Sequence, residues 1–369
     1  MVNPPLIAVS ALFFLALVSL FYSCSWIIAS LTLFLMRRRV SHAAAKQILM
    51  AALTLPPLLA IVPTLGGVTL RHSHATMSAE HHSAICLQMF GSLFSLESIH
   101  GIPALETITG AAVNGLAWLI LVSGIFLAIR LVAATVRLER GLAPYLLPPS
   151  PPLARALSRA MVMGAWKSRV YECPIPPSCS SVLGVKEVRC VLSQGLVATA
   201  EEEELDAVLA HEAIHLRMGD VRATFLVRVL SCLFFSLWPA RILARRWREE
   251  AELACDAAAI DVTGKPLAMA AAILRASGVA LKTPGNSKLP AAALGFADND
   301  ACSPAKRVEL LIAHASRAAA PPAVQTPAWR LAGWIITIGL ATIGILMLTS
   351  SQTACFAHCS LEAAARLLP

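Results

Sequence analysis

Charged side chains are scarce in this sequence. Only 14% of its 369 residues are Asp, Glu, Lys or Arg, whereas a soluble globular domain carries about 25%. Hydrophobic residues make up 57% of the chain and are gathered in long blocks. This composition argues against an ordinary soluble protein and predicts a chain embedded in a lipid bilayer. The net charge of +8 is then expected to mark the cytoplasmic ends of membrane helices.

Three signals that are typical of other protein classes are also missing. The ten cysteines include no C-x-x-C pair, which argues against a zinc ribbon or a disulfide framework. The basic residues are not interleaved with aromatic residues, so no direct nucleic-acid binding is expected. No basic residue precedes the first apolar stretch, so this stretch is predicted to be an uncleaved anchor and not a signal peptide.

The apolar blocks predict four transmembrane helices, because about 20 apolar residues span a bilayer. These blocks cover about residues 5–36, 48–70, 110–129 and 330–349. The basic loop 37–47 is expected in the cytoplasm, which puts the N-terminus outside. The loop 71–109 and the short tail 350–369 are then external. Five of the ten histidines lie in the loop 71–109, which we interpret as a solvated loop, with a metal or pH sensor as the alternative.

The long segment between the third and fourth predicted spans has a different composition. Residues 131–152 are expected to be a Pro-rich linker, and residues 153–329 a cytoplasmic α+β domain inserted into a mostly α membrane protein. Ser168–Tyr171 and Val188–Leu192 are rich in β-branched residues and predict strands. The apolar run Phe225–Trp238 is too short to span a bilayer. It predicts a helix that is buried or lies against the membrane.

The strongest motif of the chain is the H-E-x-x-H pattern formed by His211, Glu212 and His215. On a helix the two histidines share one face, so both imidazoles can reach one metal ion. Glu212 stands beside them and can deprotonate a metal-bound water. Thr199 and Glu202 predict a capping box at the start of this helix. The motif predicts a zinc hydrolase, and the alternative is a helix whose histidines are packed or solvated.

A catalytic zinc ion needs about three protein ligands and a water, so a third ligand is expected elsewhere. Glu252 and Asp256 stand four residues apart in a segment that is expected to be helical. We predict Glu252 as the third ligand and Asp256 as the hydrogen-bond partner of a histidine ligand. The alternative is a solvated acidic face. Asp220 follows His215 closely, and it either caps the next helix or contacts a residue of the site.

The stretches HEAIHLRMGD and EAELACDAAAIDVTG together resemble the membrane metallopeptidases of the BlaR/MecR antirepressor family, which transduce the beta-lactam resistance signal. The resemblance implies a gluzincin-type domain in which His211, His215 and Glu252 bind Zn²⁺ and Glu212 is the catalytic base. It also implies a penicillin-binding sensor domain after the fourth span. Only the short tail follows here, so sensing through such a domain is not expected.

A related group, the membrane proteases similar to HtpX and the CAAX-processing proteases, shares the H-E-x-x-H and E-x-x-x-D patterns. Its members have a downstream segment to which Ser303–Val308 is similar. This resemblance makes Arg307 a candidate for stabilising the oxyanion or for bracing the site.

These features together predict a membrane-integrated zinc endopeptidase that cleaves a cytoplasmic protein. The resemblance implies a transcriptional repressor as the substrate, and the strand near Val188–Leu192 is expected to offer an edge to an extended peptide. The alternatives are a quality-control protease for membrane proteins and a non-enzymatic sensor or scaffold. The inducing signal and the oligomeric state are left open.

Overall fold

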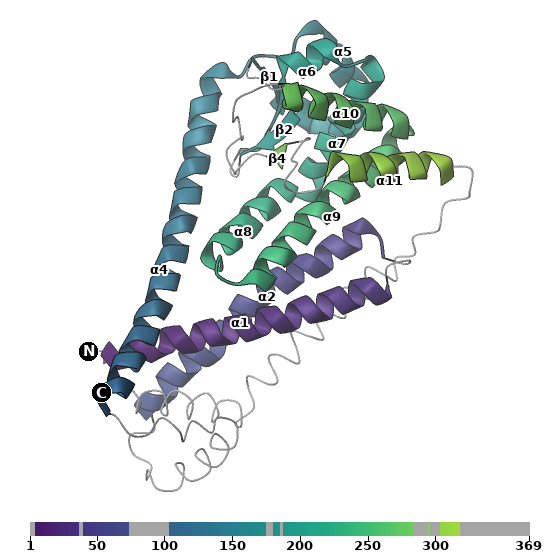
Figure 1. Ribbon diagram of the computed structural model, residues 1–369. Coiled ribbons are helices and arrows are strands. Elements are labelled where there is room, and N and C mark those ends of the chain that lie inside the picture. The colour runs from purple at the N-terminus through teal and green to yellow at the C-terminus, as the bar shows by residue number, and fades with distance from the viewer. Residues whose placement is uncertain are drawn as a thin grey trace.

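The computed structural model describes residues 4–36, 40–73, 103–174, 180–184, 187–282, 294–295 and 303–317. Within these residues, three helices are long and apolar enough to cross a membrane, over Phe14–Leu35, His42–Ile61 and Gly115–Tyr145. They belong to α1 (Pro4–Leu35), α2 (His42–Ser73) and α4 (Pro103–Leu142) (Figure 1). The fourth predicted span at 330–349 lies outside the described residues, as does most of the loop 71–109.

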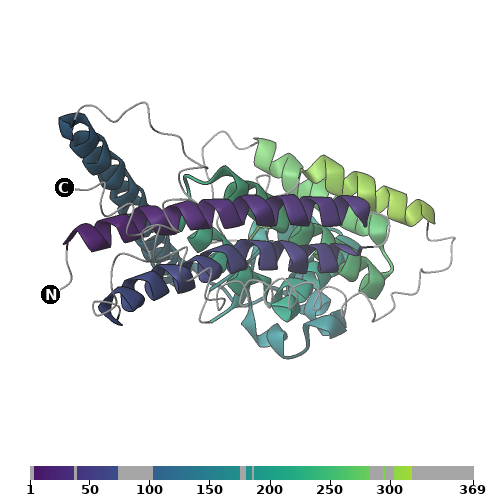
Figure 2. The same ribbon diagram turned by 90° about the horizontal axis from the view of Figure 1, so that it is seen from below.

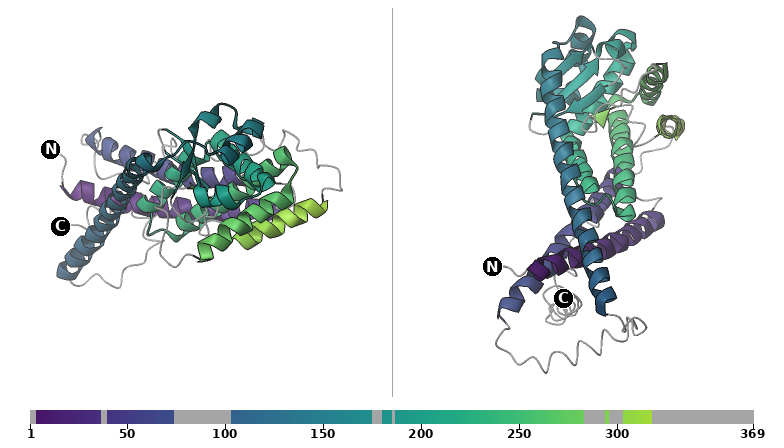
Figure 3. Two further views of the ribbon diagram at one scale, coloured as in Figure 1. Left: turned by 90° about the horizontal axis from the view of Figure 1, so that it is seen from above. Right: turned by 60° about the vertical axis from the view of Figure 1, so that its left-hand side comes forward.

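The third membrane helix is much longer than the predicted span. α4 runs along most of the height of the molecule, from the level of α1 and α2 up to the β-sheet (Figure 3). The segment 131–142 contains no proline, so nothing in it interrupts the helix, and Pro144 is the first residue that does. The predicted linker 131–152 is therefore helical in its first part. The short 3-10 helix η1 (Ala143–Tyr145) and a few extended residues connect α4 to the domain.

Two helices of the domain share a hydrophobic cluster with the first two apolar helices. α1 and α2 lie side by side (Figure 2), and α8 (Asp220–Leu233) and α9 (Trp238–Thr263) pack against them. Tyr22 and Leu53 are buried there together with Phe234, Leu243 and Trp247. The apolar run Phe225–Trp238, predicted as one helix that is buried or lies against the membrane, is thus divided. α8 ends at Leu233, and Pro239 stands in the first turn of α9, where a proline is tolerated.

A small mixed sheet forms the opposite end of the domain. Its strands are β1 (Val170–Cys173), β2 (Ser180–Leu183), β3 (Arg189–Ser193) and β4 (Leu294–Gly295), in the order β1-β3-β2-β4. Cys190 of β3 pairs with Val170 on one side and with Val182 on the other. The prediction that the strand near Val188–Leu192 offers a free edge is therefore wrong. The composition of a strand does not reveal whether both of its sides are paired.

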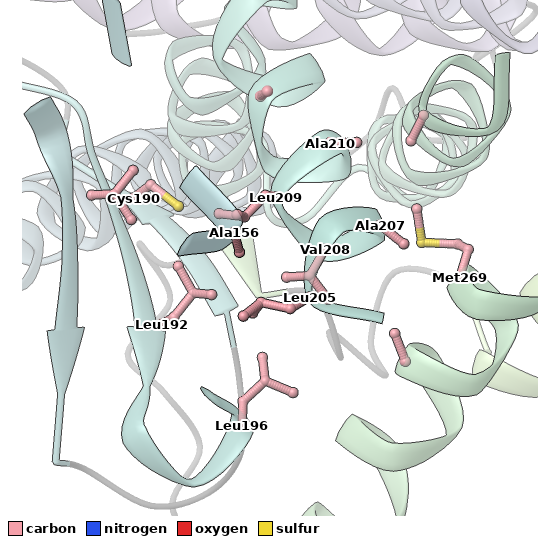
Figure 4. Close-up of a cluster of buried hydrophobic side chains, with 14 of the residues drawn as sticks. Ala156, Cys190, Leu192, Leu196, Leu205, Ala207, Val208, Leu209, Ala210 and Met269 are labelled. Carbon is pink, nitrogen blue, oxygen red and sulfur yellow. The ribbon is translucent and has the colours of Figure 1, made fainter. Parts of the chain in front are cut away.

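The H-E-x-x-H motif lies on α7 (Glu202–Met218), and α5 (Pro151–Arg159), η2 (Met161–Arg169) and α10 (Pro266–Lys282) pack against this helix. The two remaining described helices are α6 (Gln194–Thr199), which directly precedes α7, and α11 (Pro304–Arg317), which packs against α9 and α10. Figure 4 shows Leu205, Val208 and Leu209 of α7 among buried side chains of the sheet and of α10, such as Leu192 and Met269. α7 is buried along most of its length, so its side chains are held in fixed positions.

Candidate metal centre

The helix α7 begins at Glu202, with a capping box formed by Glu201 and Glu204. The backbone N–H of Glu201 donates to the Glu204 carboxylate at 2.9 Å. The predicted box of Thr199 and Glu202 is wrong. Thr199 is the last residue of α6, and its hydroxyl donates to the Gly195 carbonyl at 2.8 Å. Because α6 ends directly before α7, the sequence pattern could not show which of two neighbouring helices Thr199 belongs to.

Three potential metal ligands meet between α7 and α9. The Nε2 atoms of His211 and His215 lie 3.0 Å apart. The Glu252 carboxylate lies 3.6 Å from Nε2 of His211 and 3.5 Å from Nε2 of His215. Ligand atoms that bind one tetrahedral zinc ion at about 2.0–2.1 Å are about 3.3 Å from one another. The three buried side chains therefore fit the shared coordination of one zinc ion.

Each histidine presents its other ring nitrogen to a buried carboxylate. Nδ1 of His211 lies 3.0 Å from Asp256, and Nδ1 of His215 lies 3.0 Å from Asp220. A carboxylate at Nδ1 fixes the tautomer and the ring orientation, which leaves Nε2 for a metal ion. The position of Asp256 is the one predicted. For Asp220 the structure decides between the two possibilities: its side chain contacts His215 and makes no capping hydrogen bond in α8.

Arg307 reaches this cluster from α11, which packs against α9. Its Nε and Nη2 donate to the two oxygens of Asp256 at 2.8 and 2.7 Å, and its Nη1 lies 3.1 Å from Glu252. The side chain is only 2% exposed. A guanidinium that grips one carboxylate with two bonds holds it in a single orientation. Of the two roles expected for Arg307, the contacts favour bracing the site.

Burial and neighbouring charges set the charge states of the centre. Burial lowers the pKa of His211 to about 4 and raises that of Glu252 to about 7, although Arg307 acts to lower the latter. Burial would also raise the pKa of Asp256, but Arg307 and His211 outweigh it and lower that pKa. The pKa of Asp220 falls to about 2, because His215 and Lys46 outweigh burial. The two supporting carboxyl groups are therefore anionic, and they favour a cation nearby.

Glu212 is almost completely buried on α7, between the two histidines in sequence. It lies close enough to Glu252 for its charge to raise the pKa of that carboxyl group. The motif therefore adds a second buried carboxylate to the group formed by His211, His215 and Glu252.

Two further side chains at the centre were not singled out by the sequence. The thiol of Cys255 lies 3.2 Å from Nδ1 of His215 and 3.3 Å from Asp220. These three residues also group as potential ligands, but burial raises the pKa of Cys255 to about 12, so the sulfur keeps its proton. Lys46 of α2 contacts Asp220 from a position 174 residues away. No local pattern marks either residue.

A family model described as BlaR1 peptidase M56 matches residues 18–282 of this chain. The match includes α7 and α9, which carry His211, Glu212, His215 and Glu252, together with most of the membrane helices. It ends before α11 and Arg307. A search of the curated proteins found no match to the chain.

Proposed function

Because the chain belongs to the BlaR1 peptidase M56 family, we propose that it is a zinc endopeptidase of the membrane that cleaves a cytoplasmic protein. Family membership and the three apolar helices make it a membrane-associated metallopeptidase. The convergence of His211, His215 and Glu252 from two buried helices is the observation that supports zinc as the metal. Two histidines and a carboxylate are a typical ligand set of catalytic zinc sites.

In the proposed mechanism the protein supplies a general base, the metal ligands and the carboxylates that hold the histidine ligands in place. A bound zinc ion would polarise the scissile carbonyl and acidify a water molecule. Glu212 would act as the base that accepts a proton from the attacking water and donates it to the leaving amine. Asp256 and Asp220 hold the two imidazoles at Nδ1. These contacts position the reacting groups before the substrate arrives, which lowers the cost of reaching the transition state.

Removal of the metal is expected to abolish cleavage, and zinc should restore it. The purified full chain in detergent should contain about one zinc ion per chain. Glu252→Ala should lose most of this zinc, because two imidazoles alone bind it weakly. Glu249→Ala is the matched control on the same helix, since Glu249 pairs with the exposed Lys306 and should leave the zinc content unchanged. Full zinc content in Glu252→Ala, measured by elemental analysis, would contradict the proposed ligand set.

The proposed substrate is a transcriptional repressor, which would make this chain an antirepressor in signal transduction. A peptidase domain in which α8 and α9 share a hydrophobic cluster with the membrane helices α1 and α2 is suited to receiving a signal from the membrane. A comparison of proteomes should test this proposal, using cells that produce the intact chain or Glu212→Gln. We expect one or a few cytoplasmic proteins to be cleaved only by the intact chain. Cleavage of many membrane proteins would instead indicate quality control, and no difference would indicate a scaffold.

We further propose that the metal centre faces the cytoplasm. The basic segment 37–47 is expected on that side, and residues in it and near it contact the peptidase domain. His42, which lies in this segment at the start of α2, is 2.7 Å from Glu250 of α9. Arg246 of α9 donates to Ser30 of α1 at 3.2 Å. The segment and the metal centre therefore share one end of the membrane helices, and both termini are proposed to lie on the other side.

A further inference from the structure

One polar contact at the metal centre comes from a membrane helix. Nζ of Lys46 in α2 donates to Oδ1 of Asp220 at 2.6 Å, and Oδ2 of the same carboxylate lies 3.0 Å from Nδ1 of His215. The side chain of Lys46 is 11% exposed and that of Asp220 is 1% exposed. A single carboxylate thus connects α2 to one of the proposed metal ligands.

This carboxylate depends on Lys46 more than a surface carboxylate would. A buried anion that loses its partner is strongly destabilised, whereas an exposed one is solvated by water. Asp220 must then shift towards another donor or towards solvent, and the imidazole of His215 loses the contact that orients it. Loss of such a partner of a metal-binding histidine typically lowers metal affinity about 10–100-fold.

The same face of α2 makes a second contact with the peptidase domain, but this contact does not lead to a proposed metal ligand. His42 stands one helical turn before Lys46, and its Nδ1 lies 2.7 Å from Glu250 of α9. The side chain of His42 is 43% exposed, and Glu250 is not among the potential ligands. Of these two contacts, only that of Lys46 reaches a residue that itself contacts a proposed ligand. His42 therefore provides a matched comparison on the same helix face.

The packing around α2 makes the Lys46–Asp220–His215 contacts sensitive to the position of α2. The first half of α9 packs against α1 and α2 through Leu243 and Trp247, and its second half carries Glu252. α2 therefore contacts α9, which supplies the proposed ligand Glu252, and through Lys46 it contacts the partner of His215. A displacement of α2 would act on both sides of the metal centre.

We propose that Lys46 is a positioning residue of the metal centre. Lys46 orients His215 through Asp220, so that metal affinity depends on the position of α2 relative to the peptidase domain. The inference rests on the proposed function, because it takes His215 as a metal ligand. Under this proposal, α2 is the membrane helix whose position affects the metal affinity of the centre.

The test compares Lys46→Met, Lys46→Arg and His42→Gln in the full chain in detergent. Zinc affinity is measured by competition with a chelator, and ligand geometry by the visible absorption of bound Co²⁺. Lys46→Met is expected to weaken zinc binding about 10–100-fold and to change the Co²⁺ spectrum. Lys46→Arg keeps the positive charge and should recover most of the affinity. His42→Gln should bind zinc as the unaltered chain does.

A double-variant cycle separates positioning from a general loss of structure. If Lys46 acts through Asp220, then Lys46→Met should cause no further loss of affinity in an Asp220→Asn background. Equal losses in both backgrounds would overturn the proposal, and so would unchanged affinity and an unchanged Co²⁺ spectrum in Lys46→Met. A failure of the proposed function looks different, because the unaltered chain itself would then bind no zinc.

Discussion

Replacement of Glu212 by Gln is expected to reduce peptide cleavage by about 10²–10⁴-fold while the metal stays bound. Glutamine has nearly the shape of glutamate but cannot accept a proton from water. The proposed ligands His211, His215 and Glu252 are unchanged in this variant, so the zinc content should equal that of the unaltered chain. The measurement is the rate of substrate cleavage together with elemental analysis of the same preparation.

The matched control for this variant is Glu203→Gln, on the same helix. Glu203 has a side chain that is 64% exposed and pairs with Lys265 at the surface, so its replacement should leave both cleavage and zinc content unchanged. Cleavage by Glu212→Gln at the rate of the unaltered chain would contradict the proposed role of Glu212. Loss of zinc from that variant would show instead that Glu212 helps to hold the metal.

Replacement of Arg307 by Met is expected to lower the free energy of unfolding by about 3–5 kcal/mol. Methionine fills similar space but leaves Asp256 without its two guanidinium bonds, in a site where that carboxyl group is 4% exposed. It also removes the cation that lies 3.1 Å from Glu252. Asp256 then keeps only His211 as a partner, and a buried carboxylate that loses its cation is costly because water does not replace the lost charge. Denaturant unfolding of the chain in detergent measures the effect.

The neighbouring residue provides the control for Arg307. Lys306 pairs with Glu249 at the surface and is 51% exposed, so Lys306→Met should cost about 0–1 kcal/mol. A second variant tests the cause of the loss, since Asp256→Asn combined with Arg307→Met removes the anion that has lost its cation and should recover part of the stability. Similar losses in Arg307→Met and Lys306→Met would contradict the assignment of Arg307 as the buried brace.

Much of this site could be predicted from residue spacing. The H-E-x-x-H pattern and the spacing of Glu252 and Asp256 depend only on the regular geometry of a helix, in which positions four apart share a face. The long apolar blocks likewise predict membrane helices from length and composition. The predicted family is confirmed by the match over residues 18–282, and the structure brings His211, His215 and Glu252 together.

Other features depend on which elements become neighbours, and a linear sequence does not show this. β3 is an interior strand because β1 and β2 pair with both of its sides. The order of pairing follows from packing and not from the composition of any one strand. Thr199 and Glu201 both stand near the start of α7, and only the end of α6 decides which of them caps the helix.

The sequence by itself determined the membrane class, the family and the metal-binding pattern of this protein, because each is a property of composition or of helical spacing. The tertiary structure alone decided what supports that pattern. Asp220 contacts His215 and not the end of its own helix, Arg307 of α11 binds Asp256 of α9, and Lys46 of a membrane helix contacts Asp220 from 174 residues away. Such contacts form because burial forces each charged group to find a partner, and only the packed fold determines which partner lies within reach.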